Sequence, residues 1–234
     1  MQKPILYLIP NTLGAQSPIE ILSPSTLKSI HSLTSFIAEN AKTARAFLKE
    51  AGHPVHPSGM EIIELDKHHK NELEEVLELL AKKNNTGLIS EAGMPCIADP
   101  GAEVVNLAIK QNFRIVPLSG PSSIFLALTA SGLNGQQFIF HGYLPVQSAE
   151  RKEKIKELDQ ELKKTGFTQI FIETPYRNDG MLQDILNAAS LDIRLCIAAS
   201  LMQDDETILT RKISAWKNET YEIGKRPCMF LLGK

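Results

Sequence analysis

The sequence predicts an α/β protein. Short runs of apolar and β-branched residues recur along the chain, and longer segments of amphipathic character separate them. With 43% hydrophobic and 22% charged residues, the 234-residue chain has the composition of a globular protein rather than of a disordered one. A chain of this length forms one large domain or two small ones. We therefore expect buried strands that are covered by helices.

The predicted strands are apolar at successive positions, as in sheets that helices cover on both faces. They occupy residues 4–10, 34–39, 86–90, 113–120, 167–173, 193–200 and 227–234.

Helices are expected where apolar residues return every three or four positions. Residues 71–83 and 148–164 follow this pattern, and their charged residues are predicted to form solvated helix faces. The apolar positions are Leu73, Val76, Leu77 and Leu80 in the first segment and Ile155, Leu158 and Leu162 in the second.

The segment SEAGMPCIADPG, residues 90–101, directly follows a predicted strand and holds two prolines, two glycines and two acidic residues. Asp99 and Pro100 are expected to cap and to start the next helix. A glycine at position 93 would let the backbone approach a ligand, and Glu91 would accept hydrogen bonds from ribose hydroxyls or from an amine. We interpret residues 90–93 as part of a ligand-binding loop.

Residues 116–123, VPLSGPSS, predict a boundary between two lobes, residues 1–116 and residues 117–234. A predicted strand ends there, and Pro121 lies near the first turn of an apolar helix, where its missing N–H costs little. Ligands of open α/β sheets bind beyond the carboxyl ends of the strands. The loop at residues 90–101 lies at such an end.

A second strand end carries Glu173, Thr174, Tyr176 and Arg177. In one interpretation Thr174 caps a helix that Pro175 starts, and Arg177 forms a weak surface ion pair. In the other, Arg177 binds a phosphate or carboxylate and Tyr176 stacks on a base. The sequence leaves both open.

Several classes of protein are disfavoured. The sequence has no GxGxxG, GxxxxGK[ST], GxSxG or HExxH motif, so it gives no support for common dinucleotide, P-loop, hydrolase or zinc-protease sites. Its 25 basic residues face 27 acidic ones, so any RNA substrate requires a local basic patch. The prolines beside His53 and His56, and the lack of partners for His68 and His69, predict no metal site.

The three cysteines predict a reducing compartment. Cys96, Cys196 and Cys228 are far apart in the sequence and have apolar neighbours, which is typical of free thiols in a core. The apolar run before Pro10 is too short for a signal peptide or a membrane span. We expect a cytoplasmic protein that does not enter a membrane.

Six motifs, taken in order, resemble those of the tetrapyrrole methylase superfamily of S-adenosylmethionine-dependent methyltransferases. They are IPNTLGA, AENAKTARAFL, SEAGMPCIADPG, LSGPSS, SGLNGQQFIFHGYLP and IETPYR. Within the superfamily, the chain is most similar to the ribosomal RNA small subunit methyltransferase I family, which methylates a cytidine ribose 2′-hydroxyl in 16S rRNA. The resemblance implies two α/β lobes, each a mixed sheet flanked by helices, with the cofactor in the cleft between them, and usually a homodimer.

The resemblance also implies which residues form the site. Glu39, Glu91 and Glu173 are candidates to orient the substrate hydroxyl or to accept its proton. The candidates for binding the substrate are Lys42, Arg45, Tyr176 and Arg177. Those for binding S-adenosylmethionine are Pro10, Ser90, Glu91, Ala92, Gly93, Met94, Cys96, Ile97, Ser122, Ser123, Ile172, Pro227 and Cys228.

Three segments depart from the family pattern. Residues 39–42, Glu-Asn-Ala-Lys, replace Glu-Asp-Thr-Arg, so an acid is lost and a forked Arg becomes a Lys. Residues 91–96, Glu-Ala-Gly-Met-Pro-Cys, replace Asp-Ala-Gly-Thr-Pro-Gly, and residues 200–204, Ser-Leu-Met-Gln-Asp, replace Arg-Glu-Leu-Thr-Lys. Longer family members also carry a C-terminal extension beyond the region of resemblance. We expect cofactor binding to survive these changes more readily than rRNA recognition.

Three functions follow as hypotheses. The motifs favour a methyltransferase that acts on ribosomal RNA or on the small ribosomal subunit. The balanced charge favours a methyltransferase of a tetrapyrrole or another small substrate. The altered residues 39–42 favour a non-catalytic paralogue that binds cofactor or RNA.

Overall fold

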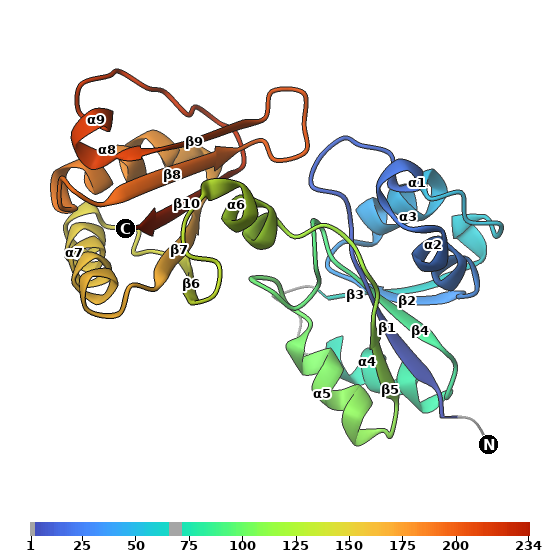
Figure 1. The fold of residues 1–234 in the computed structure, drawn as a ribbon. Coiled ribbons are helices and arrows are strands. Elements are labelled where there is room, and N and C mark those ends of the chain that lie inside the picture. Colours follow the sequence, from blue (N-terminus) through green and yellow to red (C-terminus); the bar gives the residue numbers. More distant parts are fainter. Residues whose placement is uncertain (1–2, 66–71) are drawn as a thin grey trace. The chain divides into compact units, whose positions relative to one another are not determined.

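The chain divides into two compact units, Met1–Ser122 and Ser123–Lys234 (Figure 1). The computed structural model describes residues 3–65 and 72–234. Each unit has its own sheet and its own hydrophobic core.

The first unit is built on a five-stranded sheet with the order β3-β2-β4-β1-β5. All the described pairings within this sheet are parallel, so it is more regular than the mixed sheet that the resemblance implies for each lobe. Helices lie between successive strands, and parallel strands require such crossovers. The strands are β1 (Ile5–Ile9), β2 (Ser35–Ala38), β3 (Glu61–Glu64), β4 (Thr86–Ile89) and β5 (Arg114–Pro117). The helices are α1 (Pro18–Ile21), α2 (Pro24–His31), α3 (Ala41–Glu50), η1 (Pro57–Gly59), α4 (Glu72–Ala81) and α5 (Ala102–Lys110).

Helices cover both faces of this sheet, with α1, α2 and α3 on one face and α4 and α5 on the other (Figure 1). Neighbouring strand residues therefore enter different cores: Phe36 packs in the cluster with Leu48 of α3, and Ile37 in the cluster with Leu80 of α4. This double burial explains why the strands are apolar at successive positions rather than at alternate ones.

The second unit has a mixed five-stranded sheet with the order β6-β7-β10-β8-β9. Only β6 and β7 pair in parallel, and the other described pairings are antiparallel. The helices α7 and α8 pack together, and α7 contacts β7 and β10, while α6 contacts β8, β9 and β10. The strands are β6 (Phe138–Tyr143), β7 (Thr168–Glu173), β8 (Arg194–Ala199), β9 (Thr207–Lys212) and β10 (Cys228–Gly233). The helices are α6 (Ser123–Ser131), α7 (Ser148–Thr165), η2 (Pro175–Arg177), α8 (Asn178–Ala188) and α9 (Ile213–Trp216).

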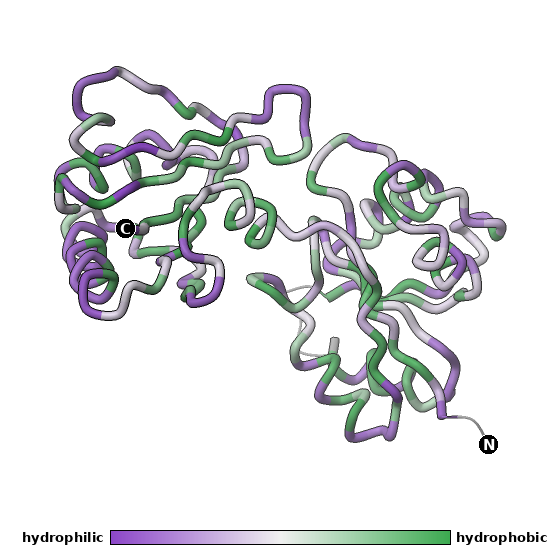
Figure 2. Tube along the Cα trace, viewed as in Figure 1, coloured by the Kyte–Doolittle hydropathy of each residue, from purple (hydrophilic) through white to green (hydrophobic). Residues whose placement is uncertain are grey.

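The seven predicted strand segments are confirmed as β1, β2, β4, β5, β7, β8 and β10. The seven segments do not include β3, β6 and β9, which lie at edges of the two sheets. Most residues of these strands are only partly buried, and charged residues interrupt the apolar pattern of β3 and β9. The tube in Figure 2 shows the central strands as hydrophobic tracts and α7 as largely hydrophilic.

Two predictions about helices need correction. Asp99 and Pro100 do not start α5, which begins at Ala102 after the N-cap residue Gly101. The φ angle of Gly101 is +127°, so the chain turns at this glycine rather than at Pro100. The charged face of α7 is not wholly solvated either, since Arg151 and Asp159 are each only 6% exposed.

The apolar seams are mostly confirmed. Ile155, Leu158 and Leu162 of α7 are buried, as are Val76 and Leu80 of α4. Leu73 is 40% exposed, and Leu79, rather than Leu77, completes the buried stripe of α4. Residue 71 and the pair His68 and His69 lie outside the described residues.

The cysteines are free thiols, with Cys196 and Cys228 buried and Cys96 half-buried. In the part of the chain that the structure describes, no helix is long and apolar enough to cross a lipid bilayer.

Candidate functional site

The loops that follow β1, β2, β4 and β5 emerge at one edge of the first sheet, because the four strands run parallel. These loops carry every residue predicted for the site in the first unit except Lys42 and Arg45, which lie exposed on α3.

The loop after β1 is hydrogen-bonded to the loop after β4. Asn11 and Gly93 form an isolated antiparallel bridge, in which the Asn11 N–H donates to the Gly93 carbonyl at 2.9 Å and the Gly93 N–H donates back at 3.2 Å. The Asn11 side-chain amide donates to the carbonyls of Ser90 at 3.0 Å and of Glu91 at 3.2 Å. The Ser90 hydroxyl donates to the Gly93 carbonyl at 2.6 Å. Asn11, which is not among the predicted site residues, therefore fixes the predicted ligand loop.

Glycines allow the loops to pack closely. A Cβ at Gly120, in the loop after β5, would collide with the ring of Pro10. A Cβ at Gly93 would lie 3.2 Å from Leu13 Cδ2 and 3.5 Å from the Pro121 carbonyl oxygen. Three strand ends thus meet, with no room for a side chain at Gly120 and little room for one at Gly93.

The predicted ligand loop also has an unusual backbone. Gly93, Cys96, Ala98 and Gly101 all have positive φ angles, of +66°, +67°, +61° and +127°. Cys96 and Ala98 are not glycines, and such conformations cost energy for residues with a Cβ. Strained backbone of this kind concentrates at functional sites.

Glu91 is exposed and is held by α3. The Thr43 hydroxyl donates to Glu91 Oε1 at 2.6 Å. Asn40 Oδ1 caps α3 by accepting the N–H groups of Lys42 at 2.9 Å and Thr43 at 3.1 Å. An Asn caps a helix about as well as an Asp does, so the altered residue 40 preserves this end of α3.

The lost negative charge is partly restored from β3. Glu64 Oε2 accepts the N–H of Ala41 at 2.7 Å, which places a carboxylate at the helix N-terminus. Glu39 lies half-buried at the end of β2, directly before this cap.

In the second unit, Glu173 and Arg177 form a buried hydrogen-bonded ion pair. Glu173 Oε1 accepts the Thr174 N–H at 2.6 Å, Arg177 Nε at 2.9 Å and Arg177 Nη2 at 2.5 Å. The Glu173 side chain is fully buried and that of Arg177 is 31% exposed, so the pair is not the weak surface contact of the first interpretation. Glu173 Oε2 is buried and has no hydrogen-bond partner among the described residues.

The capping interpretation is right in part. Pro175 is the first residue of η2, but the Thr174 side chain forms no capping hydrogen bond. Tyr176 is 82% exposed. The guanidinium of Arg177 is committed to Glu173, which leaves Tyr176 as the exposed member of the predicted substrate-binding pair.

The start of β10 lies beside the end of β7. Cys228 is in register with Glu173 of β7 and with Ala199 of β8, and Met229 is in register with Ile172. Pro227 is exposed, and its carbonyl accepts the N–H of Ser200 at 2.9 Å. Burial raises the pKa of the Cys228 thiol to about 12, so Cys228 is an uncharged packing residue at neutral pH.

His53 and His56, the two described histidines that were considered as metal ligands, bind other protein groups. His53 Nδ1 accepts the Val55 N–H at 3.1 Å, so Nε2 carries the proton that it shares with the Leu33 carbonyl at 2.9 Å. His56 Nδ1 caps η1. Among residues 3–65 and 72–234, no group of three or more His, Cys, Asp or Glu side chains is arranged to hold a metal ion.

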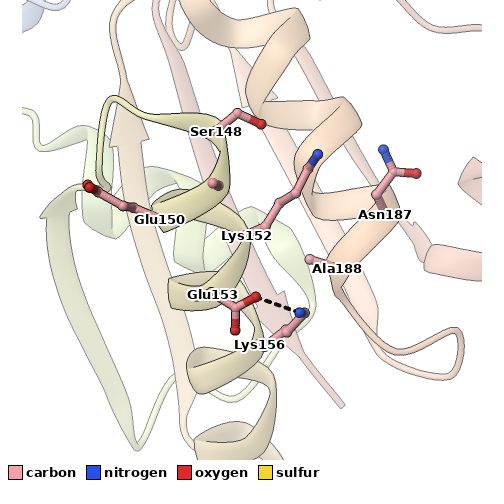
Figure 3. A pocket seen from close by; sticks show the side chains of 8 residues that line it. Ser148, Glu150, Lys152, Glu153, Lys156, Asn187 and Ala188 are labelled. Atoms are coloured by element: carbon pink, nitrogen blue, oxygen red, sulfur yellow. Dashed lines mark hydrogen bonds and ion pairs between the residues drawn. The ribbon is translucent and has the colours of Figure 1, made fainter.

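A surface hollow between α7 and α8 is shown in Figure 3. Lys156 in this hollow pairs with Glu153 at 2.7 Å, and Lys152 pairs with Asp184 at 3.3 Å. Its lining consists of Ser148, Ala149, Glu150, Lys152, Glu153, Lys156, Asn187 and Ala188. No residue predicted for the site is among them, and both lysines already have acidic partners.

The sequence profile of the Tetrapyrrole (Corrin/Porphyrin) Methylases matches residues 26–215. The chain belongs to the tetrapyrrole methylase family. This finding confirms the resemblance on which the site residues were selected.

Within the family, the chain is similar to proteins named ribosomal RNA small subunit methyltransferase I. The chain is 32% identical to the ribosomal RNA small subunit methyltransferase I of Vibrio cholerae over 206 residues, which are 88% of this chain and 67% of that protein. It is 33% identical to the Bacillus subtilis protein of the same name, over 90% of this chain and 64% of that protein. The chain thus spans about two thirds of the length of these curated relatives.

Solved structures with the same fold include the methyltransferase CobJ, with a TM-score of 0.65 and 13% identity over 100% of this chain and 95% of that one. The cobalt precorrin-4 methyltransferase CbiF superposes with a TM-score of 0.62 and 16% identity over 98% and 94%. These two likenesses confirm the predicted fold class.

Proposed function

We propose that the chain is an S-adenosylmethionine-dependent methyltransferase that methylates a ribose 2′-hydroxyl in small-subunit ribosomal RNA. The family match and the names of the relatives support this proposal. The single structural observation that carries it is the cluster of loops at the carboxyl ends of the strands of the first sheet. There Asn11 fixes a strained loop beside close-packed glycines.

The residues at this edge suit S-adenosylmethionine. The exposed carboxylate of Glu91 would accept hydrogen bonds from ribose hydroxyls, and the exposed side chain of Ile97 would contact apolar parts of the cofactor. Ser122 and Ser123, at the boundary of the two units, are half-buried and offer hydroxyl groups. In the second unit we assign Ile172, Pro227 and Cys228 to the cofactor on family resemblance alone.

When bound, the cofactor supplies a methyl group on an activated sulfonium. The protein then has mainly to position the ribose hydroxyl, and positioning can lower a barrier by about 7–11 kcal/mol. We propose that Glu39, Glu91 or Glu173 orients this hydroxyl or accepts its proton. Because Glu173 Oε1 already accepts three donors, only Oε2 is left for such a role.

Calorimetric titration with S-adenosylhomocysteine tests cofactor binding. We expect wild type to bind and a Gly93→Val variant to bind much more weakly, since valine is strongly disfavoured at a φ of +66°. Absence of binding to wild type would contradict the proposal and favour a non-catalytic paralogue.

Transfer of methyl groups to unmodified small ribosomal subunits then tests the substrate. A tetrapyrrole or other small substrate, which the balanced charge favours, predicts cofactor binding without transfer to these subunits.

We further propose a cytoplasmic homodimer. The free thiols fit a reducing compartment. Exposed apolar side chains on the second unit, Phe125 at 55%, Tyr143 at 56% and Val146 at 63%, offer a surface for a second copy. Sedimentation equilibrium checks the dimer, and a monomer at micromolar concentration would contradict it.

A further inference from the structure

We propose that Tyr176 and Lys225 form a platform that stacks one unpaired nucleotide of the RNA substrate. The inference rests on the proposed function and adds Lys225, which lies outside the six motifs, to the substrate contact. Tyr176 is 82% exposed, and the Lys225 ammonium lies 5.1 Å from the centroid of its ring. The two residues are called the platform below.

The backbone on both sides of Tyr176 is restrained. Pro175 restricts the backbone at the start of η2, and Glu173 Oε1 binds both the Thr174 N–H and the Arg177 guanidinium. Tyr176 therefore sits between two residues that are tied to one buried carboxylate. Because this backbone is already restrained, it loses little further freedom when a ligand stacks on the Tyr176 ring.

Lys225 is fixed in a similar way by the first residues of α8. The fully buried Asn178 donates its side-chain amide to the carbonyls of Gly224 at 3.0 Å and Arg226 at 2.7 Å, the two residues that flank Lys225. Asp179 Oδ1 accepts the N–H groups of Ile223 at 2.7 Å and Gly224 at 3.3 Å. The turn that presents Lys225 is thus clamped to the same segment, residues 173–179, that presents Tyr176.

The neighbouring cations are held by other groups. Arg177 is paired with Glu173, and the Arg226 guanidinium, although it keeps its charge, donates to the Ile223 carbonyl at 2.8 Å and to Thr207 Oγ1 at 3.1 Å. Lys225 forms no ion pair within residues 3–65 and 72–234, and its ring contact leaves its positive charge available to a phosphate. The exposed ring of Tyr176 therefore carries a cation that no described carboxylate pairs with.

This combination suits a single-stranded nucleotide. A base stacks on an aromatic face whatever its identity, and an adjacent cation attracts the backbone phosphate. Since Lys225 lies over one face of the Tyr176 ring, the base would stack on the other face. Paired bases offer no such free face, so the platform selects an unpaired nucleotide.

Fluorescence anisotropy with a short labelled single-stranded RNA from the small-subunit rRNA tests the proposal. We expect Tyr176→Ala to weaken binding by about 5- to 100-fold and Tyr176→Phe, which keeps the ring, to bind like wild type. Lys225→Ala should reduce the slope of log affinity against log salt by about 0.7. Lys164→Ala removes an equal charge from the exposed face of α7 and should change nothing.

Two parallel measurements separate the possible failures. Urea unfolding and S-adenosylhomocysteine titration should give wild-type values for Tyr176→Ala, which excludes a folding defect. If wild type binds RNA and Tyr176→Ala binds it equally well, the platform is refuted while the proposed function stands. If wild type binds S-adenosylhomocysteine but no RNA, the platform and the rRNA substrate both fail. If Tyr176→Ala loses affinity for intact small subunits but not for the free RNA, the residue contacts a ribosomal protein, and the assignment to RNA is overturned.

Discussion

Replacement of Gly93 by alanine tests whether the loop at residues 90–101 has to be held against its neighbours to bind the cofactor. The matched control is Gly166→Ala at the end of α7. Both glycines adopt the left-handed conformation, with φ angles of +66° and +76°. A Cβ at Gly166 would have no atom within 4 Å, whereas a Cβ at Gly93 would lie 3.2 Å from Leu13 Cδ2.

The two variants should share one loss of stability and differ in a second. Each should lose about 1–2 kcal/mol of stability, because alanine is disfavoured in the left-handed region. With alanine at position 93, either the Leu13 side chain or the loop has to shift by a few tenths of an ångström, and a shift of the loop strains the two backbone hydrogen bonds with Asn11. Each of these bonds contributes about 0.5–1.5 kcal/mol, so we expect the loop to shift and a further loss of about 1 kcal/mol.

Calorimetry with S-adenosylhomocysteine and urea unfolding measure the two effects separately. We predict that Gly166→Ala binds like wild type and that Gly93→Ala binds at least tenfold more weakly, which corresponds to about 1.4 kcal/mol. Equal affinity of the two variants would refute the reasoning, since it would show that the close packing around Gly93 has no part in cofactor binding.

The remaining predictions concern the second unit and the thiols. Arg177→Ala should destabilise the protein by about 2–3 kcal/mol, less than the 3–5 kcal/mol of a fully buried pair because Arg177 is 31% exposed, and adding Glu173→Gln should restore most of the loss in urea unfolding. Burial alone would raise the pKa of the Asp184 carboxyl, but hydrogen bonds from Ser148, Arg151 and Lys152 and the Arg151 charge outweigh it and lower that pKa. The contribution of Asp184 to the free energy of unfolding is therefore complete above the ordinary carboxyl pKa of about 4 and is lost as the pH falls through the lowered pKa. In urea unfolding at a series of pH values, Asp184→Asn should lack this acid-dependent loss of stability. Burial also raises the pKa of the Cys96 and Cys228 thiols. Native protein at neutral pH should therefore be alkylated slowly at the half-buried Cys96 and not at the buried Cys228. Mass spectrometry that found Cys228 modified first would contradict the structure.

The sequence predicts the central strands well because both faces of each of them are buried. Burial on both faces produces uninterrupted apolar runs, and these are the strongest signal of a strand between helices. The edge strands β3 and β9 lack that signal because most of their residues are only partly buried and charged residues interrupt their apolar runs. The predicted start of α5 is wrong because Asp99 and Pro100 are favourable caps, and the local pattern does not show the positive φ angles at three residues before Gly101 and at Gly101 itself.

In the candidate site too, the local sequence pattern does not reveal the contacts that hold the residues in place. A strand end with Gly93 and Glu91 is visible in the sequence, but the residue that holds it, Asn11, is 79 positions away from the Ser90 carbonyl that it binds. The altered Asn40 seemed to remove a charge, whereas Glu64 from the next strand supplies a carboxylate to the same helix end. Long-range hydrogen bonds of this kind depend on the order of strands in the sheet, which a single sequence does not contain.

Transfer of a tritiated methyl group from S-adenosylmethionine to small ribosomal subunits that lack the modification tests the central claim most directly. We predict that label enters the ribosomal RNA and that the bond after the labelled nucleotide resists alkali, because a 2′-O-methyl group prevents attack by that oxygen. Binding of S-adenosylhomocysteine together with no label in the RNA of these subunits would contradict the claim.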